Sequence, residues 1–283
     1  MEVMSSPPRQ QATANPAAIT LLLNILRVAF GGFWILVCGI PVAVVIYFTY
    51  AVGWLLEAGG RAGTLDRVVE WNAAFMGRVA RHIWSKWILA VVGVTVRTHE
   101  QVPIDWRQTH VICANHASIF DILALVRVIP GPFRFVAKRE LLRWPVFGWV
   151  LPPSGQILID RRDRSDAVRR LERGAARKVR GQVIFFVEGT RSRTGELLPF
   201  KKGAFHFAVD HQLPILPTAI CGSFGVLGRT SWWWLRPGRD IEIRYGAPIQ
   251  PPAAASPEEK TAAATSLLDI TRQAIEREIQ TTT

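Results

Sequence analysis

The sequence predicts an α/β protein whose mixed, largely parallel sheet is flanked by helices and preceded by a membrane-embedded helical segment. Three observations lead to this prediction. Short apolar runs alternate with helical stretches after residue 88, no charged residue occurs over residues 28–56, and 49% of the 283 residues are hydrophobic. This length and composition suffice for one sizeable domain with a small appendage.

The N-terminal part divides into three segments. Residues 1–18 begin with polar, proline-bearing sequence, and we expect a disordered tail there. Residues 19–60 are expected to form a membrane helix or helical hairpin, because the uncharged stretch exceeds the ~20 residues that cross a bilayer as a helix. Pro41 leaves open a kinked span or a hairpin that dips in and returns. Apolar and basic residues at helical spacing over 61–87 predict an amphipathic helix, on the membrane surface or on the domain.

The rest of the chain, residues 88–283, is predicted to form the α/β domain. The apolar runs expected as strands are 88–96, 110–114, 133–137, 156–159, 183–187, 215–220 and 241–245. Helices are expected between several of them, at 122–128, 139–150, 164–179 and 202–210. A capping box at Ser256 and Glu259 predicts a last helix over 257–279.

The charge of the chain favours an anionic partner. There are 34 Lys and Arg against 22 Asp and Glu, which gives a net charge of +12. Eleven Trp and a mean hydropathy of +0.18 favour membrane lipid over nucleic acid as that partner. One basic residue, Arg27, closely precedes the uncharged stretch, whereas five basic residues follow it over 61–86. This bias places the domain on the cytoplasmic face of the inner (plasma) membrane.

The cysteines and histidines give no sign of a bound metal. Cys38, Cys113 and Cys221 are widely spaced and form no C-x-x-C pair, so we expect neither a disulfide framework nor a zinc site. The six histidines show no metal-ligand spacing. We expect no metal and no cofactor.

The stretch "ANHASIFD", residues 114–121, follows a buried strand with a cluster of polar side chains. A turn there would let the Asp121 carboxylate bind one nitrogen of His116, and this pair is the base and orienting half of a catalytic triad. In isolation the pattern favours a helix-capping Asp121 and a turn histidine over a catalytic pair. No G-x-S-x-G nucleophile accompanies it. The pair would therefore deprotonate a hydroxyl of a second substrate, which attacks an acyl thioester.

Polar residues also follow the strand in "VIFFVEGTRSRTGELLPFKKGAF", residues 183–205. Its glycine turn and Arg191 can present backbone N–H groups and a guanidinium to a phosphate. Lys138 and the pair Asp160–Arg161 end two further strands. Each charge alone fits a solvated loop, but together they predict an electropositive pocket beside His116.

These residues, in this order, resemble the glycerolipid acyltransferase family, which contains the 1-acylglycerol-3-phosphate acyltransferases. The family's N-H-x-x-x-x-D block resembles Asn115, His116 and Asp121. Its G-x-I-x-I-D-R block resembles Gly155, Ile157, Ile159, Asp160 and Arg161. Its F-P-E-G-T-R-S block resembles Phe186, Glu188, Gly189, Thr190, Arg191 and Ser192, with Val187 in place of the proline. A fourth, apolar block resembles residues 213–220, and the similarity runs over about residues 88–250.

The resemblance implies roles for individual residues. His116 would be the general base and Asp121 its orienting partner, with Asn115 and Ser118 as supporting residues of the turn. The residues that it assigns to substrate binding are Lys138, Arg161, Glu188, Gly189, Thr190 and Arg191. Val187 would alter substrate preference more than activity.

The implied activity is that of a membrane-bound O-acyltransferase. It would move a fatty acyl chain from acyl-CoA or acyl-acyl carrier protein to the free hydroxyl of 1-acylglycerol-3-phosphate, making phosphatidic acid in phospholipid synthesis. Its partners would be the lysophospholipid acceptor, the thioester donor and membrane lipids, without nucleic acid.

Several other interpretations stay open. The acceptor could be a lyso-ornithine lipid, another lysophospholipid or glycerol 3-phosphate. A basic membrane-anchored binding protein without catalysis and a lipid hydrolase are alternatives of other classes. The aromatic run "SWWWLRPGR", residues 231–239, fits an interfacial loop or a segment packed under the sheet.

Overall fold

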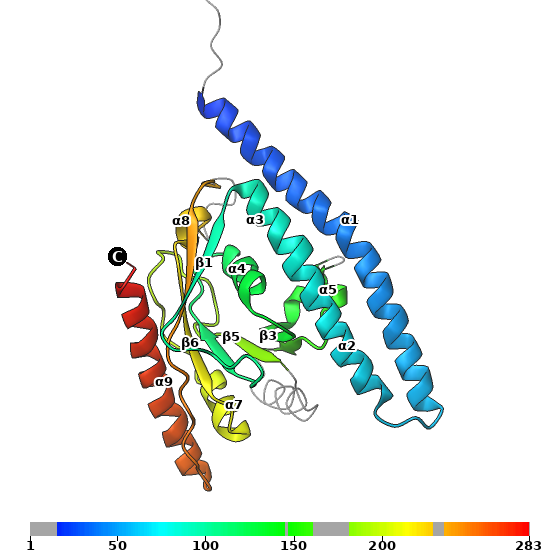
Figure 1. The fold of residues 1–283 in the computed structure, drawn as a ribbon, viewed down its shortest axis with the longest axis vertical. Helices are drawn as coiled ribbons and strands as arrows, with labels where there is room; N and C mark the ends of the chain where they lie inside the picture. The colour runs from blue at the N-terminus through cyan, green and yellow to red at the C-terminus, as the bar shows by residue number, and fades with distance from the viewer. Residues whose placement is uncertain (1–15, 145–146, 161–180, 229–234, 283) are drawn as a thin grey trace, which may run out of the picture.

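The computed structural model describes residues 16–144, 147–160, 181–228 and 235–282. Helices cover both faces of a seven-stranded sheet, in the order β1-β7-β6-β2-β5-β3-β4 (Figure 1). The strands are β1 (Thr95–Glu100), β2 (Val111–Ala114), β3 (Phe133–Lys138), β4 (Ile157–Ile159), β5 (Gln182–Phe186), β6 (Ile215–Cys221) and β7 (Asp240–Tyr245).

The directions of the strands confirm the predicted mixed, largely parallel sheet. Strands β6, β2, β5, β3 and β4 run parallel to one another. Strand β7 is antiparallel to β6, and β1 is parallel to β7. The carboxyl ends of the five parallel strands therefore meet at one edge, which is where open α/β sheets bind ligands.

Two helical layers bury both faces of the central strands. In β2, Ile112 and Ala114 belong to the core that contains Leu125 of α4, whereas Val111 and Cys113 belong to the opposite core. Such burial on both sides explains why β2 is continuously apolar. The first layer comprises α2 (Thr64–Val79), the π-helical η1 (Ala80–Ser85), α3 (Lys86–Val92) and α4 (Phe120–Val128). The second comprises α7 (Gly203–His211) and α9 (Pro257–Gln280).

Helix α1 (Pro16–Ala58) is a single continuous helix that passes through Pro41, so the structure has one helix rather than a hairpin over residues 28–56. It turns at residues 59–63 and packs against α2, which runs back along it (Figure 1). Within the described residues, α1 is the helix that is long and apolar enough to cross a membrane, by length and composition. Its membrane insertion stays a prediction.

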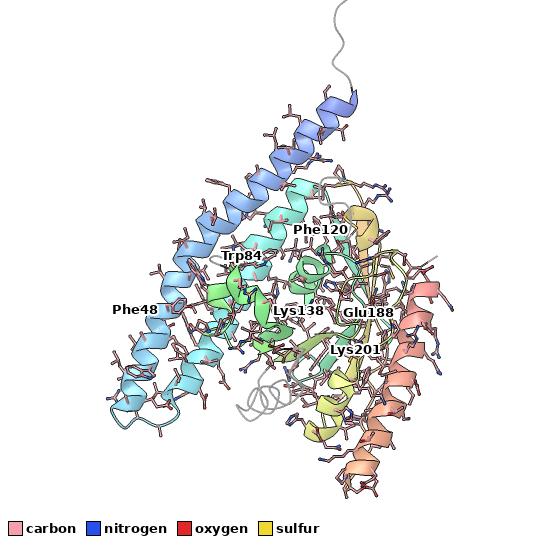
Figure 2. All side chains as sticks on the ribbon, turned by 180° about the vertical axis from the view of Figure 1, so that it is seen from behind. Phe48, Trp84, Phe120, Lys138, Glu188 and Lys201 are labelled. Carbon is pink, nitrogen blue, oxygen red and sulfur yellow. The ribbon has the colours of Figure 1, made fainter. Side chains whose placement is uncertain are left out.

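One side of α1 is packed on the domain and the other is exposed. Ile46 is fully buried, whereas Phe48 is 68% exposed and points away from the domain (Figure 2). Polar contacts along its length help to fix α1 in place. The amide nitrogen of Asn24 donates to the carbonyl of Leu235 (3.0 Å), the hydroxyl of Thr49 donates to the amide oxygen of the buried Asn72 (2.8 Å), and the Tyr47 hydroxyl donates to the carbonyl of Trp149 (2.7 Å).

Two predicted elements differ from the structure. The predicted strand 88–96 is wrong over most of its length, because α3 continues to Val92 and ends at Gly93, whose φ of 69° is left-handed. Leu89 and Val92 are the buried residues there, and their i, i+3 spacing is helical. The predicted helix 139–150 is instead a 3₁₀ turn, η2 (Arg139–Arg143), and a short helix, α5 (Phe147–Val150).

The last helix forms as predicted, with its capping box. The Ser256 hydroxyl accepts from the Glu259 N–H (3.1 Å), and the Glu259 carboxylate accepts from the Ser256 N–H (3.2 Å). The predicted helix at 164–179 and residues 1–15 of the predicted tail lie outside the described residues.

Candidate active site

The side chains of His116 and Asp121 form a hydrogen-bonded pair at the carboxyl end of β2. The distance from His116 Nδ1 to Asp121 Oδ2 is 2.7 Å. Asp121 is fully buried in the first turn of α4, whereas the His116 side chain is 13% exposed. Because the carboxylate accepts the Nδ1 proton, Nε2 is left with a lone pair for a substrate. The arrangement can remove a proton from a hydroxyl.

Asp121 Oδ2 also shapes the turn around the histidine. It accepts hydrogen bonds from the N–H groups of Ala117 (2.7 Å) and Ser118 (2.8 Å). Asp121 is not the N-cap of α4, which is Ile119, and the two N–H groups that its carboxylate binds lie in the turn before the helix. These contacts lock the Asp121 carboxylate and the His116 backbone into one geometry, which fixes the orientation of the imidazole.

Asn115 and Ser118 attach the turn to distant parts of the chain. The Asn115 amide exchanges two hydrogen bonds with the backbone of Ile220 in β6, with distances of 3.0 and 2.7 Å. The Ser118 hydroxyl donates to the carbonyl of Leu227 (2.7 Å). The His116 ring stacks on Phe186, with ring centroids 3.9 Å apart. The supporting role of Asn115 and Ser118 in catalysis stays a prediction.

Glu188 binds backbone groups with both carboxylate oxygens. Oε1 accepts from the N–H of His116 (2.8 Å), and Oε2 accepts from the N–H of Leu198 (3.1 Å). The side chain is 3% exposed, and this burial raises the pKa of the carboxyl to about 7, against the lowering effect of the two N–H donors. Glu188 thus holds the His116 turn to the segment after β5. These contacts favour a positioning role over the substrate-binding role expected from the resemblance.

The residues that follow Glu188 form a turn beside His116. Gly189 has a φ of 73°, which a glycine adopts without strain. Thr190 and Arg191 are half-buried, and the N–H of Ser192 donates to the carbonyl of His116 (2.8 Å). The two polar segments are therefore joined directly. The substrate-binding roles of Gly189, Thr190 and Arg191 stay predictions.

Val187 makes a hydrogen bond that a proline would lack. Its N–H donates to the carbonyl of Ala114 (3.1 Å), which extends the β2–β5 pairing by one step towards His116. A proline has no N–H to donate. The departure from the family's pattern thus adds a backbone contact at the edge of the site.

Lys138 ends β3 on the same edge of the sheet, and its side chain is exposed. Next to it, a pocket of about 470 Å³ is lined by Arg139, Glu140, Leu142, Arg143 and Asp160. Arg139 and Arg143 were not among the predicted site residues, although they directly follow Lys138 in "KRELLR". Arg161 lies outside the described residues. The two arginines of this pocket are balanced by Glu140 and Asp160, and the pocket lies one strand beyond β5. The electropositive pocket expected beside His116 stays a prediction.

Comparison with known proteins identifies the domain that contains these residues. Residues 93–221 match the sequence model of a family described as Acyltransferase. The part of the chain that contains the His116 turn is therefore similar to an acyltransferase domain. This finding confirms the resemblance deduced from the motifs, and both His116 and Asp121 lie within the matched residues.

Three curated relatives that match this part of the chain are 1-acyl-sn-glycerol-3-phosphate acyltransferases. A 1-acyl-sn-glycerol-3-phosphate acyltransferase of Cocos nucifera is 33% identical over 62% of this chain and 56% of its own length. The Saccharomyces cerevisiae protein of that name is 37% identical over 44% of each chain. The human alpha form is 41% identical over 39% of this chain and 40% of its own. The chain thus spans about half the length of these curated relatives.

A solved structure has a similar fold over nearly the whole chain. The crystal structure of the 1-acyl-sn-glycerophosphate (LPA) acyltransferase PlsC from Thermotoga maritima superimposes with a TM-score of 0.60. It covers 93% of this chain and 97% of its own, at 20% identity. This match supports the α/β fold together with the N-terminal helices.

Proposed function

We propose that this protein is a membrane-bound O-acyltransferase that moves a fatty acyl chain from a thioester donor to the free hydroxyl of 1-acylglycerol-3-phosphate. The His116–Asp121 pair, which the Glu188 carboxylate joins to the segment after β5, carries the proposal. The acyltransferase domain and the names of its relatives support this choice of reaction. The product, phosphatidic acid, would feed phospholipid synthesis at the cytoplasmic face of the membrane.

In the proposed reaction, Nε2 of His116 takes the proton of the acceptor hydroxyl as its oxygen attacks the thioester carbonyl. The new C–O bond forms, the C–S bond breaks, and the thiolate leaves with the proton from the imidazolium. Asp121 stabilises the imidazolium through Nδ1–H. The substrate hydroxyl is the nucleophile, so no acyl-enzyme forms.

The transient oxyanion needs hydrogen-bond donors other than those of the turn itself. The N–H groups of Ala117 and Ser118 are directed at Asp121, and the N–H of His116 is directed at Glu188. The turn therefore uses three consecutive N–H groups to fix its own geometry. We infer that other groups at this edge of the sheet, or the acceptor's own groups, stabilise the oxyanion.

The acceptor phosphate is proposed to bind at the basic strand ends. Lys138 ends β3, and the turn with Gly189, Thr190 and Arg191 follows β5, the strand between β3 and β2. Arg139 and Arg143 line the adjoining pocket. Guanidinium groups bind phosphate oxygens in a forked geometry, which suits a phosphomonoester. Arg161 is part of this proposal through the resemblance alone.

The exposed side of α1 is proposed to contact the membrane. Its large exposed side chains include Phe33, Phe48 and Trp54, and exposed Trp71 and Trp87 extend the apolar surface onto α2 and α3. An apolar surface of this extent marks an interaction site, and Trp favours the boundary between water and hydrocarbon. Both substrates carry acyl chains, so this contact would bring His116 to them.

An acceptor panel tests the proposed function. The protein in membranes is supplied with palmitoyl-CoA and, in separate reactions, lysophosphatidic acid, other lysophospholipids, a lyso-ornithine lipid, glycerol 3-phosphate or no acceptor. We expect thiol release that requires an acceptor and is fastest with lysophosphatidic acid, with phosphatidic acid identified by mass spectrometry. Equal release without acceptor would indicate hydrolysis and contradict the proposal. Faster release with another acceptor would change the assigned substrate.

A further inference from the structure

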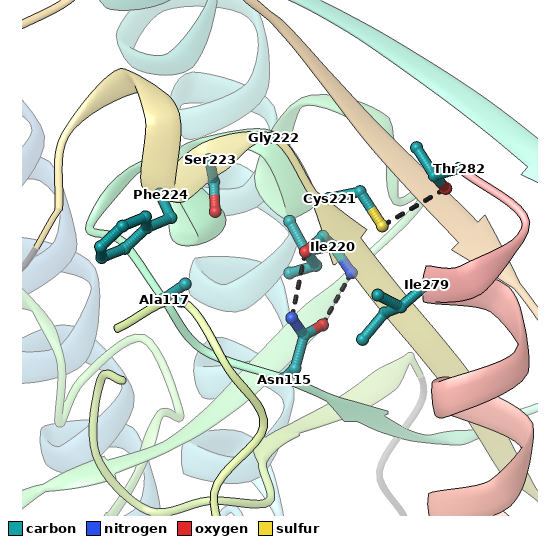
Figure 3. A pocket seen from close by; sticks show the side chains of 10 residues that line it. Asn115, Ala117, Ile220, Cys221, Gly222, Ser223, Phe224, Ile279 and Thr282 are labelled. Carbon is teal, nitrogen blue, oxygen red and sulfur yellow. Dashed lines mark hydrogen bonds between the residues drawn. The ribbon is translucent and has the colours of Figure 1, made fainter. Parts of the chain in front are cut away.

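A second pocket, of about 250 Å³, opens beside the His116 turn at the carboxyl end of β6 (Figure 3). Asn115 and Ala117, the neighbours of His116 in the chain, line one side of it. Cys221 and Ser223 line the side formed by β6 and α8 (Ser223–Val226), and Thr282 lies at the end of α9. The acceptor groups described above lie on the other side of β2, towards β5 and β3.

A buried hydroxyl in this pocket has no partner. Ser223 is 1% exposed, and its Oγ makes no hydrogen bond within the described protein. In Figure 3 the hydroxyl points towards the space between Ala117 and Ile220. Buried polar groups in native proteins are normally hydrogen-bonded. The wall of the pocket thus contains a buried hydroxyl without a partner among the described residues.

The lining of the pocket suits an uncharged chain with a few polar groups. Phe224 and Ile279 provide apolar surface, whereas Ser223 and Thr282 provide hydroxyls. The residues that line it are all uncharged, so it offers nothing for the phosphate of the acceptor. A narrow ligand that carries amides and hydroxyls on an alkyl framework matches this combination.

Basic residues lie next to α8, outside the pocket. The Arg239 side chain packs over Gly225, where an added Cβ would lie 3.5 Å from Arg239 Cδ. The N–H of Arg236 donates to the carbonyl of Val226 (2.9 Å), and both arginines are exposed. Two exposed arginines thus lie beside α8, the helix whose first two residues line the pocket, and such cations can bind a phosphate or an acidic surface.

We propose that this pocket binds the phosphopantetheine arm of the thioester donor, an inference that rests on the proposed function. The arm is an uncharged chain of two amides and a hydroxyl, with a thiol at one end and a phosphate at the other. Its thiol end lies beside Asn115 and Ala117 and so next to His116, and its phosphate end lies at Arg236 and Arg239. CoA and acyl carrier protein share this arm, so either can be the donor.

Cys221 provides a direct readout of occupancy, because it lines the pocket and is half-buried with a free thiol. The experiment uses a Cys38→Ser variant, in which Cys113 is the remaining cysteine besides Cys221. Cys113 is fully buried, so alkylation reports on Cys221. Alkylation of Cys221 by N-ethylmaleimide is followed by mass spectrometry. The competing ligand is a thioether analogue of acyl-CoA, because its sulfur does not react with maleimide. At ten times its Kd it should slow alkylation of Cys221 about tenfold, since about a tenth of the protein stays free. Lysophosphatidic acid should leave the rate unchanged.

The two sources of the arm are distinguished in parallel reactions. Acyl carrier protein with a thioether-capped arm is compared with the same carrier protein lacking the arm. Protection by the CoA analogue alone identifies CoA as the donor, and protection by the armed carrier protein alone identifies the carrier protein. Protection by the carrier protein without its arm would overturn the assignment of the pocket to the arm.

A matched pair of variants tests the same point by kinetics. Thr282→Trp places a large ring at an exposed position that lines the pocket, whereas Thr281→Trp alters an exposed neighbour that does not line it. We expect Thr282→Trp to raise KM for the acyl donor about tenfold, which corresponds to about 1.4 kcal/mol. KM for the lysolipid should not change, and Thr281→Trp should behave as the unaltered protein.

The outcomes separate this inference from the proposed function. Acyl transfer without donor protection of Cys221 would overturn the pocket assignment and leave the proposed function standing. Protection by lysophosphatidic acid in place of the donor would make this the acceptor site and also overturn it. Donor protection in a protein that transfers no acyl chain to any acceptor would uphold the pocket assignment and contradict the proposed function.

Discussion

Replacing Glu188 by Gln separates a positioning role from a substrate-binding role. In the structure both carboxylate oxygens accept backbone hydrogen bonds, one from His116 and one from Leu198. The Gln side chain has the same shape but a single oxygen, so its NH₂ group must face one of these two N–H donors. One buried N–H then loses its acceptor, and two donors are placed against each other.

The magnitude follows from the burial of the site. Leaving a buried N–H unsatisfied costs about 1–3 kcal/mol, and Glu188 is 3% exposed. If the variant avoids this cost by displacing the His116 turn, the loss of about 1–3 kcal/mol of positioning energy lowers kcat by roughly 5- to 150-fold. The KM values for donor and lysolipid should stay within about twofold, because no substrate contact has been removed.

The assay is thiol release under saturation with each substrate in turn, for the unaltered protein, Glu188→Gln and the exposed control Glu196→Gln. Unfolding by urea establishes that the Glu188 variant is folded at the assay temperature. A rise in KM for the lysolipid with kcat unchanged would refute the reasoning, because it would place Glu188 against the acceptor.

Three further predictions concern the orienting carboxylate, pH and the membrane surface. Asp121→Asn should lower kcat by about 10³–10⁴-fold, since the amide cannot stabilise the imidazolium; a loss below tenfold in the thiol-release assay would contradict this. The Glu188 pKa lies at about 7 in the folded state, above its ordinary value of 4.5. The folded state therefore binds more protons between these values, so the free energy of unfolding should fall as pH rises through this window. Urea unfolding should show this slope for the unaltered protein and lose it in Glu188→Gln; an unchanged slope in the variant would assign it to other groups. The double change Phe33→Ser and Phe48→Ser should weaken sedimentation with anionic vesicles at least about tenfold, since each buried Phe contributes about 1.5–3 kcal/mol; unchanged binding would exclude this side of α1 as the contact.

The sequence was most informative where the structure is determined by local pattern. The polar residues directly after β2 and β5 predicted which sheet edge carries the site, because parallel strands bring their carboxyl ends together. The contact between His116 and Asp121 followed from their spacing across one turn. In the same way, Ser256 and Glu259 predicted the start of α9.

Contacts between distant parts of the chain could not be predicted in this way. Asn115 is held by Ile220, which is 105 residues further along, and Ser118 by Leu227, which is 109 residues further along. No local pattern records such pairings. The contacts of the Glu188 carboxylate with the N–H groups of His116 and Leu198 could not be predicted for the same reason. The substrate-binding role of Glu188 stays a prediction.

The strand predicted over 88–96 shows a different limit. A short, continuously apolar run fits a buried strand and a buried helix equally well. Here the packing of α3 against the first core decided in favour of the helix, since Leu89 and Val92 both belong to that core.

The most direct test of the central claim is thiol release from palmitoyl-CoA with lysophosphatidic acid, measured for the unaltered protein, His116→Ala and His99→Ala in matched membranes. His99 is an exposed histidine on β1 and serves as the control. The account predicts that acceptor-dependent release is abolished in His116→Ala and retained in His99→Ala, with equal amounts of both variants in the membrane. Appreciable acceptor-dependent release by His116→Ala would contradict the assignment of His116 as the base.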